Sequence, residues 1–152
     1  MKQRVAVTMT DDEVGALLAY ARKVQTATIN PDGTPHLVTM FFGLAEGRIA
    51  FWTYRSSQKA LNLARDPRLT CLVEDGEDYF ELRGVQITGR VTRIEDLPGV
   101  TAVGRLIAAR MPDVPRDALD AYVTHAARKR VAYLVQPART ASWDHRKLLS
   151  SP

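Results

Sequence analysis

The sequence predicts a mainly β fold, a small barrel of six or so antiparallel strands with short α-helices attached. Segments rich in β-branched and aromatic residues recur at hairpin spacing. Strong turn signals such as Asn30-Pro31-Asp32-Gly33 separate these segments. The connections between them are too short for the helices of a doubly wound parallel sheet. The length of 152 residues suits one core, so residues 1–152 are expected to form a single domain.

The first predicted element is a short amphipathic helix. Thr10-Asp11-Asp12-Glu13 has the form of a capping box, in which Thr10 accepts from the amide three residues on and Glu13 reaches back. Apolar residues then follow at helical spacing, and the helix is expected to end near residues 22–23, where cations suit its dipole. These apolar residues are Val14, Leu17, Leu18 and Ala21.

Strands are expected next at residues 24–29, 35–44 and 49–54. The turns at 30–33 and 45–48 join them at hairpin spacing. An antiparallel meander of these three strands is therefore predicted.

A second helix and another strand follow this meander. Ser57 is placed to cap a helix that runs to about Arg65 and that Asp66-Pro67 stops. A strand is expected at residues 69–73. Residues 79–94 are long enough for one bent strand.

The C-terminal part of the chain alternates helices and strands. Gly84 and Gly89 are expected bend or bulge points of the long strand. Asp96 and Pro98 open a helix to about Arg110, and Pro112 stops it. A further helix over 117–128 and strands over 131–135 and 139–143 are the remaining predicted elements.

Composition excludes several classes of protein. The chain carries 21 basic and 17 acidic residues, a net charge of +4, and 45% hydrophobic residues, as ordinary globular proteins do. No apolar run approaches the roughly 20 residues that span a bilayer, and no secretory signal is recognised at the N-terminus. Cys71 is the sole cysteine, so no intrachain disulfide and no metal site are expected, and the expected location is cytoplasmic.

The content of basic residues is weak evidence for a nucleic-acid partner. Arginine accounts for 16 of the 21, which suits an anionic ligand but equally follows from a codon bias toward arginine. The positive charge is spread along the chain, and no aromatic–basic RNA-binding motif is present. No nucleic-acid and no membrane partner is expected.

Four segments together resemble one superfamily, the split β-barrel proteins that bind flavin or deazaflavin. Residues 51–63 with Asp66-Pro67-Arg68 resemble its signature, residues 27–39 its first hairpin and residues 83–91 its long central strand. The superfamily includes pyridoxamine 5′-phosphate oxidase and the coenzyme F420-dependent oxidoreductases, and residues 142–148 are similar to endings of the F420 branch. The resemblance spans about residues 24–148 and implies a split β-barrel, FMN-binding-protein-like fold.

The segment after residue 52 has the composition of an anion pocket. A strand end, a tight turn and a helix start bring hydroxyls, free amides and two cations together. For Ser57 a plain helix N-cap is the alternative, and for Lys59 a solvated helix residue. The resemblance assigns the cofactor's phosphate and ribityl chain to Thr53, Arg55, Ser57, Gln58 and Lys59.

The resemblance also implies where the cofactor's ring system and a second subunit lie. The rings are expected against Thr39, Met40 and Phe41, although the same residues also suit core or interface packing. Asn62 is favoured as a structural hydrogen-bonding residue over a cofactor contact. The cofactor would lie between the two subunits of a homodimer, with Trp143 and Lys147 approaching from the partner chain. Packing at the dimer interface is an equal alternative for Trp143.

The function implied by the resemblance is that of an F420-dependent reductase, which transfers a hydride between its deazaflavin and a small unsaturated organic substrate. No catalytic side chain is assigned. Residues 105–112 and 143–146 lack the substrate-phosphate clamp of true pyridoxamine-phosphate oxidases, so oxidation of vitamin B6 is not expected. The alternatives are an FMN-dependent oxidase or reductase and a non-catalytic flavin or haem carrier.

Overall fold

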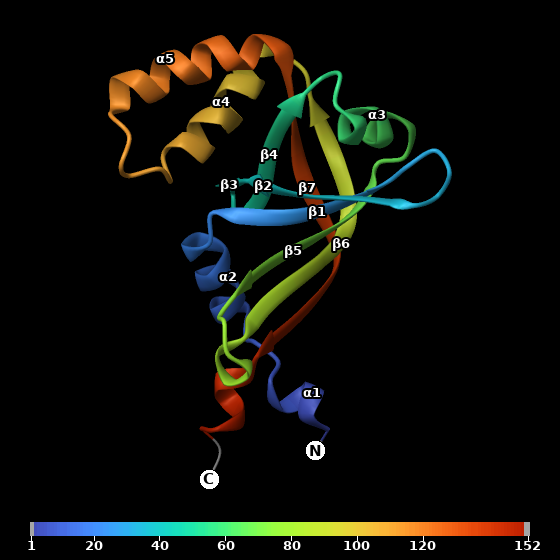
Figure 1. Cartoon of the computed structure of the whole chain (residues 1–152), viewed down its shortest axis with the longest axis vertical. Helices are drawn as coiled ribbons and strands as arrows, with labels where there is room; N and C mark the ends of the chain where they lie inside the picture. Colours follow the sequence, from blue (N-terminus) through green and yellow to red (C-terminus); the bar gives the residue numbers. More distant parts are fainter. Residues whose placement is uncertain (1, 151–152) are drawn as a thin grey trace.

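The computed structural model describes residues 2–150 and consists of a curled antiparallel sheet with helices around it (Figure 1). Within these residues the sheet has seven strands in the order β2-β1-β5-β6-β7-β4-β3. The mainly β prediction is therefore confirmed. The strands are β1 Lys23–Ile29, β2 Pro35–Phe41, β3 Gly43–Ala45, β4 Arg48–Tyr54, β5 Arg68–Asp75, β6 Arg83–Ile94 and β7 Arg130–Asp144.

The sheet curls into a half-open barrel because β2 and β3 are consecutive in the chain yet lie at opposite ends of the strand order. Phe42 alone separates them, and its amide donates to the carbonyl of Arg22 at 3.2 Å. The predicted strand over 35–44 is therefore split at Phe42. Its first part pairs with β1 and its last part, β3, pairs with β4, so both predicted hairpins form but not one continuous three-strand meander. Phe42 is buried and turns the chain, and β4 pairs with β7 instead of β2.

Local signals predict the starts of three helices correctly. The first predicted helix ends at Tyr20, before the expected residues 22–23, and the short helix Gln3–Ala6 was not predicted. The side chains of Thr10, Ser57 and Asp96 accept hydrogen bonds from backbone amides in the first turns of α2, α3 and α4. Glu13 does not complete the predicted capping box, because its carboxylate pairs with Lys147. The α-helices are α1 Gln3–Ala6, α2 Asp11–Tyr20, α3 Gln58–Arg65, α4 Leu97–Ala108 and α5 Arg116–Ala126.

Two predicted strand boundaries are corrected. Tyr79–Glu81 forms a short 3₁₀ helix, so the long strand starts at Arg83. The two expected C-terminal strands are one continuous strand, β7. Its pairing with β6 shifts register between Thr88 and Gly89 of β6, where Gly89 pairs with Pro137 of β7. A Cβ on Gly89 would overlap the carbonyl of Gln136, which confirms the predicted bulge at this glycine.

The hydrophobic core fills the inside of the barrel. Phe51, Val85 and Tyr133 are among its fully buried side chains. Cys71 is buried there, and its burial raises the pKa of the thiol to about 12. A second cluster lies between the outer faces of β4 and β7 and helix α4. This cluster fixes α4 and α5 over one end of the barrel, opposite the end where the described chain starts and stops (Figure 1).

Tyr133 is an unusual core residue because its buried hydroxyl has no hydrogen-bond partner within the described part of the chain. Its ring packs on Phe51 with centroids 5.3 Å apart. Leaving such a group unpaired costs about 1–3 kcal/mol, so Tyr133→Phe is expected to raise the free energy of unfolding by about 1 kcal/mol. Urea denaturation measures this change, with Tyr54→Phe at an exposed site as the neutral control. A destabilised Tyr133→Phe would reveal a bonded hydroxyl.

None of the helices in residues 2–150 combines the length and the apolarity needed to cross a bilayer.

Candidate functional site

A cavity of about 450 Å³ lies where the barrel is split. Residues 38–41 of β2 line one side of it, and β2 pairs only with β1 among the described strands. Trp52, Thr53 and Tyr54 of β4 line the other side, beyond the short stretch that β3 covers. Neither strand has a further strand partner on this side within the described residues, although the carbonyl of Tyr54 accepts from the amide of Ser57 at 3.0 Å. Such strand edges can present backbone amides and carbonyls to a planar ring with polar edges.

One corner of the cavity is polar and cationic. The hydroxyl of Thr53 lies 3.2 Å from that of Ser57, which also accepts from the amide of Ala60 at 3.2 Å as the N-cap of α3. Lys59 follows in the first turn of α3, is half-buried and lines the cavity. Burial lowers the pKa of its ammonium group. Among residues 2–150 no carboxylate lines this cavity, so its polar end is suited to an anion.

The structure brings five of the ten predicted site residues into this cavity, namely Thr39, Met40, Phe41, Thr53 and Lys59. Ser57 stands directly behind Thr53 through the hydroxyl contact. The strand–turn–helix unit and the edge of β2 thus meet, as the resemblance implied.

Arg55 and Gln58 are exposed and bond to other parts of the chain. Nη2 of Arg55 donates to the carbonyl of Arg128 at 2.8 Å, and Nε2 of Gln58 donates to Oδ1 of Asn62 at 2.8 Å. Asn62 itself is fully buried and donates to Thr28 at 3.1 Å and Asn30 at 3.0 Å. This arrangement supports the structural role favoured for Asn62. Cofactor contacts by Arg55 and Gln58 stay predictions.

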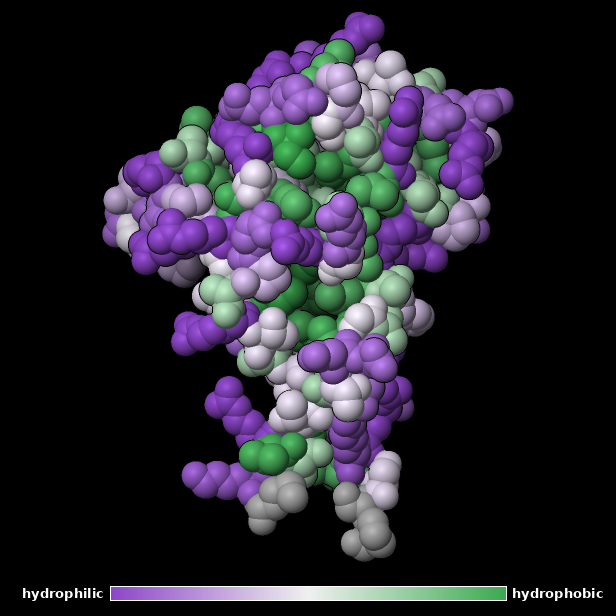
Figure 2. Space-filling view, turned by 180° about the vertical axis from the view of Figure 1, so that it is seen from behind, coloured by the Kyte–Doolittle hydropathy of each residue, from purple (hydrophilic) through white to green (hydrophobic). Residues whose placement is uncertain are grey.

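Trp143 lies on a different surface, the outer face of the sheet. It is the register partner of Gly84, and a Cβ on that glycine would overlap the indole ring. A hollow of about 700 Å³ surrounds it, lined without charged side chains by β1, β2, β5 and β6 in the described chain. Leu37 is exposed in this hollow, and Thr39 lines both the hollow and the cavity. Apolar surface also gathers over the centre of the molecule in Figure 2.

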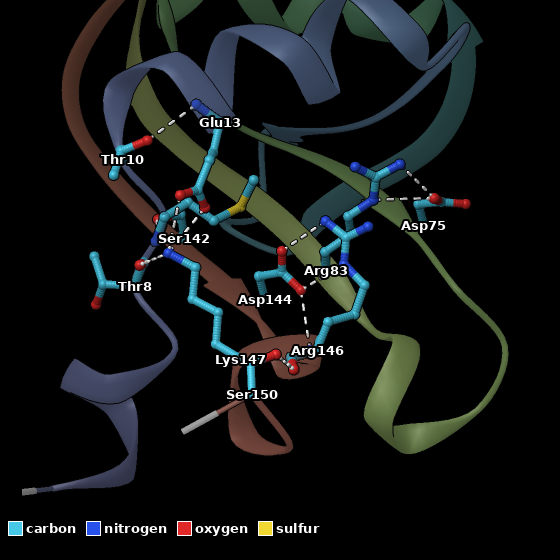
Figure 3. A network of polar contacts seen from close by, with 11 residues as sticks. Thr8, Thr10, Glu13, Asp75, Arg83, Ser142, Asp144, Arg146, Lys147 and Ser150 are labelled. Carbon is cyan, nitrogen blue, oxygen red and sulfur yellow. Dashed lines mark hydrogen bonds and ion pairs between the residues drawn. The ribbon is translucent and has the colours of Figure 1, made fainter. Parts of the chain in front are cut away.

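Lys147 lies in the short 3₁₀ helix that follows β7, His145–Leu148, and belongs to a polar network there (Figure 3). Its ammonium donates to the carbonyl of Thr8 at 3.0 Å and pairs with Glu13 at 2.9 Å. Nearby, Asp144 accepts from Arg146 and Asp75 from Arg83, and these arginines hold the pKa of both carboxyls below their usual values. Within one chain Lys147 does not line the cavity, so its predicted role requires a partner subunit.

Sequence reasoning missed one whole wall of the cavity. Helices α4 and α5 supply a largely apolar wall, and Arg130 closes it at the start of β7. The sequence predicted a helix over 117–128 but gave no sign that its apolar residues Leu119 and Val123, which are buried, would face this cavity. The lining residues from α4 and α5 and their connection are Gly104, Ile107, Ala108, Met111, Leu119, Tyr122 and Val123.

Gly104 sets how closely α4 approaches the cavity. A Cβ there would overlap the indole ring of Trp52 and lie 2.9 Å from Val123. Gly104→Ala is therefore expected to push the Trp52 ring into the cavity, changing tryptophan fluorescence and weakening ligand binding about 10-fold. Gly15→Ala is the matched control, because Gly15 is an exposed helical glycine with nothing within 4 Å of the added Cβ. Equal ligand affinity in Gly104→Ala and wild type would contradict this account.

The fold and the cavity together define a split β-barrel of the flavin-binding class. The chain belongs to the pyridoxamine 5′-phosphate oxidase family, whose sequence profile matches residues 10–144. It is 30% identical over 122 residues to a pyridoxine/pyridoxamine 5′-phosphate oxidase of Cupriavidus taiwanensis, a match that covers 72% of this chain and 56% of that protein. The chain thus spans little more than half the length of this curated relative.

Two solved structures have a similar fold. The conserved hypothetical protein Rv2991 of Mycobacterium tuberculosis matches with a TM-score of 0.89 and 38% identity over 100% of this chain and 94% of that one. An F420 reductase matches with a TM-score of 0.63 and 23% identity over 82% of this chain and 93% of that one. At this identity, the match to the F420 reductase shows similarity of fold alone.

Proposed function

We propose that the chain is an F420-dependent reductase that transfers a hydride between its deazaflavin cofactor and a small unsaturated organic substrate. The observation that carries this proposal is a cavity with a partly desolvated lysine, no carboxylate among its described lining residues, and two open strand edges. A cofactor with a phosphate and a planar, polar-edged ring system complements each of these features.

The residues of the chain fit such a cofactor. Lys59 and the Thr53–Ser57 hydroxyl pair would hold the phosphate, because a half-buried cation in a cavity whose described lining has no carboxylate gains from an anion. The backbone edges at Thr39–Phe41 and Trp52–Tyr54 would orient the rings. The bound deazaflavin would supply two-electron hydride chemistry. The protein's own tasks are then to bind, to orient and to exclude water through the apolar α4–α5 wall.

The working unit in this proposal is a homodimer with the cofactor at the subunit interface. The uncharged hollow around Trp143 and Leu37 adjoins the cavity through Thr39, so a second copy covering this face would complete the site. Lys147 and Trp143 would then reach the cofactor of the partner subunit. Sedimentation measured with and without cofactor tests this arrangement, and a monomer that binds cofactor fully would reject it.

The arginines of residues 105–112 do not form a substrate-phosphate clamp at this cavity. Arg110 lies in residues 105–112, where the resemblance would place such a clamp. It donates to backbone carbonyls at the end of α2 and to the carbonyl of Phe42. Arg105 in the same segment is exposed and outside the cavity lining. The α4–α5 wall therefore offers a substrate apolar contacts in place of a phosphate clamp.

A direct comparison of cofactors tests the proposal. Purified protein is titrated with F420 and with FMN, and fluorescence follows binding. Tighter binding of F420, with reduction of an activated enone by reduced F420, is the expected result. A yellow protein that releases FMN on denaturation would replace F420 by the FMN-dependent alternative. Tight binding of haem or flavin without turnover would favour a carrier.

A further inference from the structure

Arg130 is held rigidly at the wall of the cavity. It is the first residue of β7 and the register partner of Tyr54 in β4. Its guanidinium carbon lies 4.2 Å from the centroid of the Tyr54 ring and 4.9 Å from that of Trp52. Nη1 donates to the carbonyl of Ala126 at 3.2 Å, and Nη2 lies 3.5 Å from the hydroxyl of Tyr122. Stacking and hydrogen bonds thus fix a planar cation in one orientation.

This cation has donors to spare and no acidic partner. A guanidinium carries five N–H donors in a fixed fork, and the Ala126 and Tyr122 contacts engage two of them. Within residues 2–150 Arg130 forms no ion pair, and neither Asp nor Glu lines the cavity. A planar guanidinium stacked on aromatic rings is well suited to bind a carboxylate with two parallel hydrogen bonds.

Lys59 and Arg130 reach the cavity from separate elements, α3 and β7. The rest of the wall on the α4–α5 side is apolar, through Ile107, Met111 and Val123. Two cations and an apolar wall suit two anionic groups with an apolar body packed alongside. Because the proposed function assigns the cofactor phosphate to Lys59, Arg130 remains available to bind a second anionic group.

We propose that Arg130 binds the carboxylate of the substrate, and that the substrate class is an apolar unsaturated carboxylic acid whose body packs on α4 and α5. This inference rests on the proposed function, because that function assigns Lys59 to the cofactor. Arg130 then determines specificity, because it fixes the position of the substrate end that carries the carboxylate.

Two probes of the same shape, one an anionic carboxylate and one a neutral amide, test the inference. The affinities of 2-naphthoate and 2-naphthamide are measured by calorimetry on cofactor-saturated and cofactor-free protein. Wild type is expected to prefer the carboxylate about 10-fold or more, as a charge-assisted hydrogen bond allows. Arg130→Gln is expected to abolish this preference and to leave cofactor affinity unchanged. Lys59→Gln is expected to keep the preference and to lose cofactor affinity.

Controls separate binding from folding. Arg128→Gln, an exposed neighbour, is expected to behave as wild type. If Arg130→Gln fails to fold, Arg130→Lys keeps the charge without the planar fork and is expected to reduce the preference.

Three outcomes would overturn the role of Arg130. These are equal affinities for both probes in wild type, a preference that survives both Arg130 variants, and a loss of cofactor affinity in Arg130→Gln as large as in Lys59→Gln. Wild type that binds neither F420 nor FMN would instead overturn the proposed function, with the charge preference still measurable on cofactor-free protein.

Discussion

Replacing Lys59 by methionine is expected to weaken cofactor binding by about 10- to 100-fold, the range that loss of one charge-assisted phosphate contact gives. Methionine keeps the apolar stem of the side chain and removes only the ammonium group. Fluorescence titration with F420 and with FMN measures the loss.

The same variant is expected to unfold at an equal or slightly higher temperature than wild type in the absence of cofactor. Burial lowers the pKa of Lys59, which means that the charged form is less favourable in the folded chain than in the unfolded chain. Removing the charge therefore removes a desolvation cost from the cofactor-free folded state, while it weakens cofactor binding.

Two arginines provide the comparison for this experiment. Arg116→Ala, at an exposed position outside the cavity lining, is expected to leave binding unchanged. Arg55→Ala is expected to have a smaller effect than Lys59→Met, because its guanidinium is exposed and bonded to Arg128. Cofactor affinity unchanged in Lys59→Met would place the phosphate elsewhere.

Arg110→Met is expected to lower the free energy of unfolding by about 2–4 kcal/mol, since charged hydrogen bonds to partly buried carbonyls contribute about 1.5–3 kcal/mol. Nη2 of Arg110 donates to the carbonyl of Leu18 at 2.7 Å and to those of Ala19 and Ala21 at the end of α2. Its guanidinium also lies 4.4 Å from the centroid of the Phe42 ring. One side chain thus ties α2, the β2–β3 corner and the segment after α4 together.

Urea denaturation of Arg110→Met measures this loss. Arg105→Ala, an exposed arginine on α4, is the matched control and is expected to change stability by less than about 0.5 kcal/mol. An equally small loss in Arg110→Met would show that solvent replaces its contacts.

The parts of the fold that the sequence predicted are those governed by neighbouring residues. Thr10, Ser57 and Asp96 cap helices because each side chain bonds an amide three residues away. The β1–β2 hairpin follows from its four-residue turn, and the bulge follows from Gly89. Such short-range bonds depend on little beyond local backbone geometry.

The predictions that were wrong concern contacts between distant segments. The pairing of β4 with β7 leaves no local trace in residues 48–54, so the hairpin spacing suggested β2 as the partner. The candidate site divides in the same way. Thr53 and Lys59 lie within one strand–turn–helix unit, whereas Arg130 reaches the cavity only through pairing with Tyr54, which neither segment reveals alone.

This long-range pairing also determines when the cavity forms during folding. Strand β4 carries one side of the cavity, and its pairing in the barrel, Phe51 with Tyr133, closes a loop of about 80 residues. Contacts of such high sequence separation form late and slow the folding of β-rich chains. We therefore expect the local turn that carries Lys59 to form before the cavity does. A ribosome must synthesise β7 before the chain can hold a cofactor.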